Sequence, residues 1–241
     1  MLFVIFLLLT ADHETSIVGE AATLPTQYGM ANRNDTAISL AYSDYTGTLP
    51  SELGFMTLVT TAALGAGPYI SPTPTSYNKF TGSLPTELGS MTAMASNLAL
   101  GSSQFTGGLP TELGRMTAIL KQLYLHSNLF EGVLPTELGK MTGMTSTINL
   151  RGNGFIGALP SELGNITALA SDLNLGSNKF SKRVPTELGR MTAMRTKFYL
   201  DRNSFSGALP TEFGGLSIMQ TYLELQENSL LAVPHRLVRK E

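Results

Sequence analysis

The amino-acid sequence predicts an α/β repeat solenoid, with a parallel β-sheet on its concave face and short helical or 3-10 turns on its convex face. Two observations lead to this prediction. A Leu-Pro or Val-Pro dipeptide recurs nine times in 241 residues, mostly at intervals of 25 residues. Most intervals also contain two apolar residues spaced two apart, then Asn, then an aromatic residue. A unit of this size cannot bury its own apolar face, so neighbouring units have to stack.

The dipeptides define the units of the array. They begin at Leu24, Leu49, Leu84, Leu109, Leu134, Leu159, Val184, Leu209 and Val233. With the residue before Pro as position 1, the unit reads LP[ST]ELGxMTxMxxxLxLxxNxFxGx. We therefore expect a repeat domain over residues 24–241, made of about eight repeats of 24–25 residues. One interval is 35 residues long and contains a Pro-rich insertion near 67–76.

Positions 15 and 17 predict one short strand per unit, and no second strand. Both positions are apolar, as in Ile148 and Leu150, and they alternate with mostly polar or small residues, which is the period of a strand buried on one face. Asn at position 20, such as Asn153, follows the strand, and its amide can satisfy backbone groups left open by the turn. Position 22 is usually Phe, which predicts an aromatic column inside the far wall.

Positions 3 to 6 predict a turn on the convex face. Thr or Ser at position 3 is expected to cap a turn of Glu-Leu-Gly that is too short for an α-helix. Glu at position 4 recurs in seven units, which predicts a solvated acidic edge. Positions 8 and 11, often Met, are expected to close the core beneath the turn.

Composition and motifs argue against catalysis. With no Cys and only three His, the chain lacks the ligands of thiolate zinc sites and iron–sulfur clusters, and it has no cysteine nucleophile. A net charge of −2 provides no basic patch for nucleic acid. Gly152 to Gly157 matches GxGxxG, but Leu159 and Pro160 follow where a dinucleotide-binding motif needs a helix. We therefore expect a protein that is not an enzyme, with no catalytic residues, no metal, no cofactor and no nucleic-acid partner.

The unit resembles the plant-type leucine-rich repeat, in which LxGxIP or LxGxLP follows an LxLxxN strand. The resemblance covers residues 24 to about 238. It implies a leucine-rich-repeat horseshoe or spiral, similar to the ectodomains of receptor-like proteins and receptor-like kinases. Two features depart from the plant pattern: the unit is one residue longer, and the chain has no Cys for disulfide-paired caps.

Positions 14, 16 and 18 are expected to point away from the core and to form a continuous surface across the parallel strands. We predict that this surface binds a protein, peptide or glycan partner, because Tyr and Arg, which are enriched at interface hot spots, gather in its C-terminal half. The candidate ligand-binding residues are Tyr124, His126, Asn149, Arg151, Asp172, Asn174, Tyr199, Asp201, Tyr222 and Glu224. The expected anchors among them are Tyr124, Arg151, Tyr199 and Tyr222.

The N-terminal residues and two sequons bear on location. Residues 1–23 include the apolar run LFVIFLLL, which has the length of a signal-peptide core and is too short to span a bilayer. No Lys or Arg precedes it, so we interpret 1–23 as a possible truncated leader. Sequons at Asn34 and Asn165 fit a secretory route. The sequence predicts an extracellular or cell-surface binding module with no membrane span in this chain. A cytoplasmic scaffolding protein and a fragment of a receptor-like kinase ectodomain stay open as alternatives.

Overall fold

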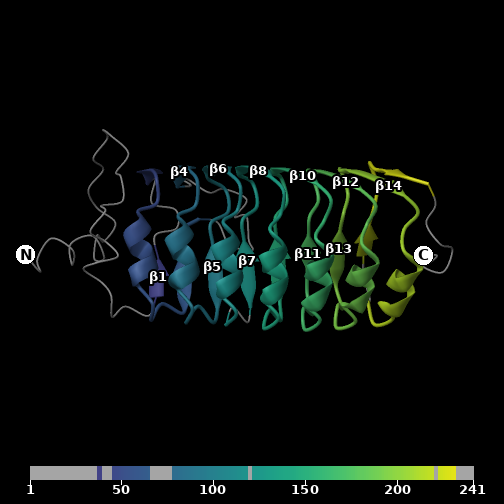
Figure 1. The fold of residues 1–241 in the computed structure, drawn as a ribbon, viewed down its shortest axis with the longest axis horizontal. Helices are drawn as coiled ribbons and strands as arrows, with labels where there is room; N and C mark the ends of the chain where they lie inside the picture. The colour runs from purple at the N-terminus through teal and green to yellow at the C-terminus, as the bar shows by residue number, and fades with distance from the viewer. Residues whose placement is uncertain (1–36, 40–44, 66–77, 119–120, 220–221, 232–241) are drawn as a thin grey trace, which may run out of the picture.

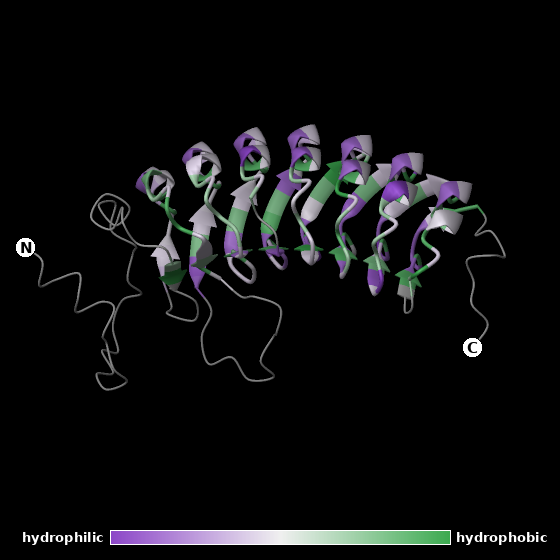
Figure 2. Cartoon of the chain, turned by 90° about the horizontal axis from the view of Figure 1, so that it is seen from below, coloured by the Kyte–Doolittle hydropathy of each residue, from purple (hydrophilic) through white to green (hydrophobic). Residues whose placement is uncertain are grey.

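The repeat units stack along one axis into a curved solenoid (Figures 1 and 2). The computed structural model describes residues 37–39, 45–65, 78–118, 121–219 and 222–231. The 3-10 helices lie on the outer side of the arc, as Figure 2 shows. This arrangement confirms the predicted repeat solenoid. The possible leader at 1–23, the insertion near 67–76 and the sequon at Asn34 lie outside the described residues.

Positions 14 to 16 form the predicted concave sheet, in which every strand pairs in parallel with the strands of the adjacent units. Leu123, for example, is the register partner of Ile148. The apolar positions 15 and 17 of this sheet face the core, where Ile148 and Leu150 are buried. The strands in order are β1 (Ala37–Ser39), β3 (Thr61–Ala63), β5 (Asn97–Ala99), β7 (Gln122–Tyr124), β9 (Thr147–Asn149), β11 (Leu173–Asn174), β13 (Lys197–Tyr199) and β15 (Tyr222–Glu224).

A second parallel sheet runs along one edge of the solenoid, at the top of Figure 1. The prediction of a single strand per unit is therefore wrong. Phe at position 22 points inward while positions 21 and 23 point outward, which is strand alternation in a segment too short to be recognised from its period. The strands are β2 (Thr46–Gly47), β4 (Lys79–Gly82), β6 (Gln104–Gly107), β8 (Leu129–Gly132), β10 (Gly154–Gly157), β12 (Lys179–Lys182), β14 (Ser204–Gly207) and β16 (Ser229–Leu230).

The predicted convex turns are 3-10 helices, but their N-terminal ends are not capped as expected. Pro occupies the cap position, and its carbonyl accepts a hydrogen bond from the backbone N–H of Leu, as between Pro135 and Leu138 at 3.2 Å. The Thr136 hydroxyl instead donates to the carboxylate of Glu137 at 3.2 Å. The helices are η1 (Ser51–Phe55), η2 (Thr86–Ser90), η3 (Thr111–Arg115), η4 (Thr136–Lys140), η5 (Ser161–Asn165), η6 (Thr186–Arg190) and η7 (Thr211–Gly215).

The predicted aromatic column is confirmed. Neighbouring rings stack with centroids 5.8 to 6.2 Å apart. The column consists of Tyr45, Phe80, Phe105, Phe130, Phe155, Phe180 and Phe205. Burial raises the pKa of the Tyr45 phenol. Met and Leu side chains under the 3-10 helices complete one continuous core.

Asn at position 20 joins each unit to the one before it. Asn128 accepts a hydrogen bond from the N–H of Phe105 at 3.2 Å and donates to the carbonyl of Leu100 at 2.9 Å. It also donates to the carbonyl of Leu125 in its own unit, at 3.1 Å. The predicted role of this Asn is confirmed, and the bonds also cross between units. Equivalent donors to the preceding unit are Asn153, Asn178, Asn203 and Asn228. Asn78 donates to Leu64 in its own unit and accepts from the N–H of Tyr45 in the preceding unit.

Gly at position 6 permits close stacking of the 3-10 helices. A Cβ atom on Gly139 would overlap the backbone carbonyl of Glu162 in the next unit. The same overlap would occur for Gly54, Gly89, Gly114, Gly164 and Gly189. At Gly108, in contrast, an added Cβ atom would lie 3.7 Å from the nearest described atom, the carbonyl oxygen of Glu131.

Gly139→Ala is expected to lower the free energy of unfolding by about 1–3 kcal/mol, because the rigid carbonyl of Glu162 cannot move away without disturbing η5. Urea unfolding followed by circular dichroism measures the change. The matched control is Gly108→Ala, which adds only this ordinary van der Waals contact and is expected to be neutral or slightly stabilising. Equal destabilisation by both variants would contradict the proposed role of helix stacking.

Candidate functional site

The predicted ligand-binding residues lie in columns on the concave sheet between β7 and β15. Position 16 contributes a column that runs across five strands, formed by Tyr124, Asn149, Asn174, Tyr199 and Glu224. Position 18, two residues after the end of each of these strands, contributes His126, Arg151 and Asp201. Asp172 and Tyr222 occupy position 14. The side chain of Tyr222 lies outside the described part of the structure.

Three of these residues are buried, contrary to the expectation that positions 16 and 18 face solvent throughout. Tyr124 is 2% exposed, His126 4% and Asp201 1%. The rings of Tyr124 and His126 meet edge to face, with centroids 6.2 Å apart. These side chains therefore offer almost no contact area to a ligand, and Tyr124 is a poor candidate for an anchor.

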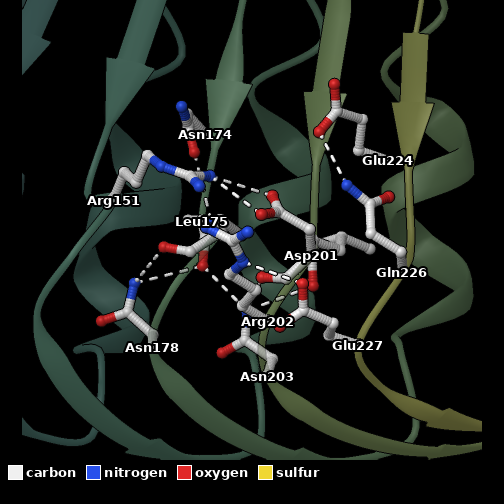
Figure 3. Close-up of polar contacts among 12 residues, drawn as sticks. Arg151, Asn174, Leu175, Asn178, Asp201, Arg202, Asn203, Glu224, Gln226 and Glu227 are labelled. Atoms are coloured by element: carbon white, nitrogen blue, oxygen red, sulfur yellow. Dashed lines mark hydrogen bonds and ion pairs between the residues drawn. The ribbon is translucent and has the colours of Figure 1, made fainter.

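Asp201 is buried beneath an arginine from two strands away. Nη1 of Arg151 lies 3.0 and 3.1 Å from the two carboxylate oxygens of Asp201 (Figure 3). The residue between them in this column is Gly176, and a Cβ atom there would overlap both Asp201 and Arg151. The ion pair thus depends on a side-chain-free position in the intervening unit. The Arg151 side chain is still 33% exposed, so part of the guanidinium faces the concave surface.

Asn149 and Asn174 have fixed amide orientations. The side-chain oxygen of Asn149 accepts from the N–H of Arg151 at 3.1 Å, and that of Asn174 accepts from the N–H of Gly176 at 3.2 Å. Because the oxygen atoms are used in this way, the Nδ2 donors are the part of each amide left for a ligand. Neither Nδ2 group donates to a residue in the described ranges. Both side chains are partly exposed.

Lys197 and Tyr199 form a polar patch at the C-terminal end of this surface. The Lys197 ammonium lies 5.7 Å from the centre of the Tyr199 ring. A hydrogen bond to Tyr199 raises the pKa of Lys197, and the nearby carboxylates of Asp172 and Glu224 act in the same direction. Lys197 therefore carries its positive charge at neutral pH. Asp172 accepts a hydrogen bond from Thr196 at 2.8 Å, and Glu224 accepts one from Gln226 at 3.0 Å.

Three other features of the described residues bear on function: metal-binding clusters, membrane-spanning helices and surface hollows. Within the described ranges, no group of three or more His, Asp or Glu side chains is placed to hold a metal ion. No helix in that part of the chain has the length and apolarity needed to cross a bilayer. A hollow on the convex side, between η6 and η7, is lined by Thr186, Glu187, Gly189, Arg190, Glu212 and Gly215.

Comparisons with known proteins identify the class of fold. The Leucine Rich Repeat family profile matches residues 120–141. The ectodomain of the Arabidopsis thaliana receptor kinase GASSHO1/SCHENGEN3, solved in complex with Casparian strip integrity factor 2, superposes with a TM-score of 0.71 at 26% identity. The Arabidopsis receptor kinase HAESA, solved with the peptide hormone IDA and the co-receptor SERK1, superposes with a TM-score of 0.69 at 25% identity. This chain has the fold of plant-type leucine-rich-repeat ectodomains and is similar to those of plant receptor kinases.

The alignments cover most of this chain but different shares of the proteins that it resembles. The two receptor alignments each cover 87% of this chain, but only 26% and 36% of the respective receptor chains. A plant ice-binding protein shares the fold, with a TM-score of 0.62 at 19% identity over 88% of this chain and 70% of its own. No curated protein sequence matches the chain.

Arg151→Met is expected to lower the free energy of unfolding by about 3–5 kcal/mol, because it leaves the Asp201 carboxylate buried without a partner. Thermal and urea unfolding measure the loss. The double variant Arg151→Met, Asp201→Ala removes the buried charge as well and is expected to recover much of the stability. Additive losses in this double-mutant cycle would show that the two side chains are not coupled.

Proposed function

We propose that this protein is a non-enzymatic recognition module that binds an extended peptide along the concave sheet between β9 and β15. The observation that carries this proposal is a row of hydrogen-bond donors on neighbouring strands. The row comprises the amides of Asn149 and Asn174, the exposed part of the Arg151 guanidinium, the Lys197 ammonium and the Tyr199 hydroxyl. An extended peptide has a carbonyl acceptor at every residue, which suits such a row.

Geometry and charge support a peptide over other ligands. Adjacent strands lie about 4.8 Å apart, so a chain crossing them meets a new side chain at each strand. The fixed amides lose little conformational entropy on binding, which favours affinity. Lys197 lies among Asp172 and Glu224, so the surface suits a ligand with charges of both signs. The similar HAESA structure contains a peptide hormone. A glycan or a folded protein surface is the alternative ligand.

We further propose that the protein acts outside the cell. Support comes from the similarity to the ectodomain of a plant membrane receptor kinase. The sequon at Asn165 adds to it, because Asn165 and Thr167 are both exposed at the end of η5. Asn165 lies on the convex side, so a glycan there would leave the concave sheet accessible.

The peptide-binding proposal is tested with a displayed library of random linear peptides selected against the full chain. The triple variant Asn149→Ala, Asn174→Ala, Tyr199→Ala is expected to weaken a selected peptide by roughly 100-fold, since loss of each contact costs on the order of 1 kcal/mol. Isothermal titration calorimetry measures the affinity. The matched control is Thr142→Ala, Thr192→Ala on the convex side, which is expected to change nothing. Unchanged binding by the triple variant would contradict the proposal.

The location proposal predicts glycosylation of Asn165 when the full chain is expressed in plant cells. Digestion with an N-glycosidase should increase the electrophoretic mobility of the secreted protein. Asn165→Gln should remove the part of that shift due to this site, and Asn34→Gln separates the contribution of the other sequon. Retention of the unmodified protein in the cytosol would refute the location.

A further inference from the structure

A cluster of apolar side chains is exposed on the second sheet. Leu129, Val133 and Ile156 are 60%, 62% and 47% exposed, respectively. Leu129 lies on β8 and Ile156 on β10, which pairs with β8. Val133 directly follows β8, and its side chain lies over Gly157 of β10. Val133 and Ile156 are therefore neighbours at the centre of this face.

The other units provide a reference for these positions, because each column contains one residue per unit. Apart from the three residues of the cluster, the described residues at positions 21, 23 and 25 are polar or small. Leu231, near the end of the described chain, is the exception. The polar or small residues are Lys79, Gln104, Gly154, Lys179, Ser204 and Ser229 at position 21, Thr46, Thr81, Thr106, Glu131, Ser181 and Ser206 at position 23, and Thr48, Ser83, Gly108, Ala158, Arg183 and Ala208 at position 25. The fold itself thus does not require apolar residues on this face, and exposed apolar clusters mark interaction sites.

Charges of opposite sign flank the apolar centre. Glu131 on β8 is exposed, and among the residues that the structure describes at positions 21, 23 and 25 it is the only carboxylate. On the other side, Lys179 and Lys182 on β12 and Arg183 directly after it are all exposed. Ile156 on β10 is the register partner of Lys179. The face, which we call the lateral patch, is thus acidic on β8, apolar at β10 and basic on β12.

Lys182 occupies a strained backbone position. Its φ angle is +70°, while the equivalent residues of the neighbouring units are glycines with φ between +72° and +80°. An L-residue in this region costs about 1–2 kcal/mol relative to glycine. Strain of this kind persists where the side chain has a use, and here it adds a positive charge to the lateral patch.

We infer that the lateral patch is an interface with a second copy of this chain. A two-fold axis parallel to β10 places β8 of each copy against β12 of the other and β10 against β10. Glu131 then faces the basic strand of the partner copy twice, two residues along the strand from Lys179, and Ile156 covers its own equivalent with Val133 beside it. An isologous interface needs this self-complementarity. A patch with charges of only one sign would require a partner of the opposite charge. The lateral patch carries charges of both signs, so a second copy can complement it.

The experiment is sedimentation of the full chain from micromolar to millimolar concentration, with charge-reversed variants. Glu131→Lys and Lys179→Glu should each weaken dimerisation by roughly 10-fold or more, because like charges then meet twice. An equimolar mixture of the two variants should dimerise again, because both contacts then pair Lys with an acidic residue. The mixture separates a specific interface from unfolding, since each variant must be folded to complement the other.

Two further variants complete the test. Lys182→Gly should raise the unfolding midpoint by relieving the backbone strain, yet weaken the dimer. Lys140→Glu, an exposed reversal on the convex η4, is the control and should leave the dimer unchanged. A wild-type chain that stays monomeric throughout the concentration range, or a mixture that does not re-associate, would overturn the inference.

Discussion

Contact between neighbouring units is the constraint on which this structure depends. No unit has a core of its own: its Phe ring stacks on the rings of the units on either side, and the amide of its Asn bonds to the backbone of the unit before it. Burial and hydrogen bonding are therefore satisfied between units, and stability follows the nearest-neighbour behaviour of repeat proteins. The glycine at position 6 belongs to the same constraint, because it sets how closely the 3-10 helices approach.

The same stacking organises the surfaces. Each outward position of the unit becomes a column that runs along the array, so one substitution changes one point on an otherwise regular face. The concave sheet and the lateral patch use this property differently. On the concave sheet, polar donors on adjacent strands form a continuous row. On the second sheet, the few residues of the lateral patch differ from the residues at the same positions of the other units. Arg151 and Asp201 show that a column can also interact with itself across an intervening glycine.

Much of the fold could be predicted from the sequence, because the signals are local and are repeated many times. The strand at positions 15 and 17, the Phe column and the Asn bonds follow from alternation, burial and side-chain chemistry. The second strand was missed because only Phe at its centre is apolar, which is too little to show a period. The predicted cap of the 3-10 helix is wrong because Thr at position 3 is adjacent to Glu at position 4. The Thr hydroxyl donates to that carboxylate instead of capping the helix. Exposure within the candidate site was the hardest to predict. Burial of Asp201 depends on Arg151, fifty residues earlier, and on Gly176 between them.

The Asn bonds also have a consequence for how the array opens. Asn153 reaches back to the carbonyl of Leu125, 28 residues earlier, and to the N–H of Phe130, 23 residues earlier. A unit with a neighbour on each side is therefore clamped twice, once by its own Asn and once by the Asn of the following unit. Local opening of such a unit has to break the bonds to both neighbours, so its amide hydrogens should exchange with solvent only when the adjacent units open with it.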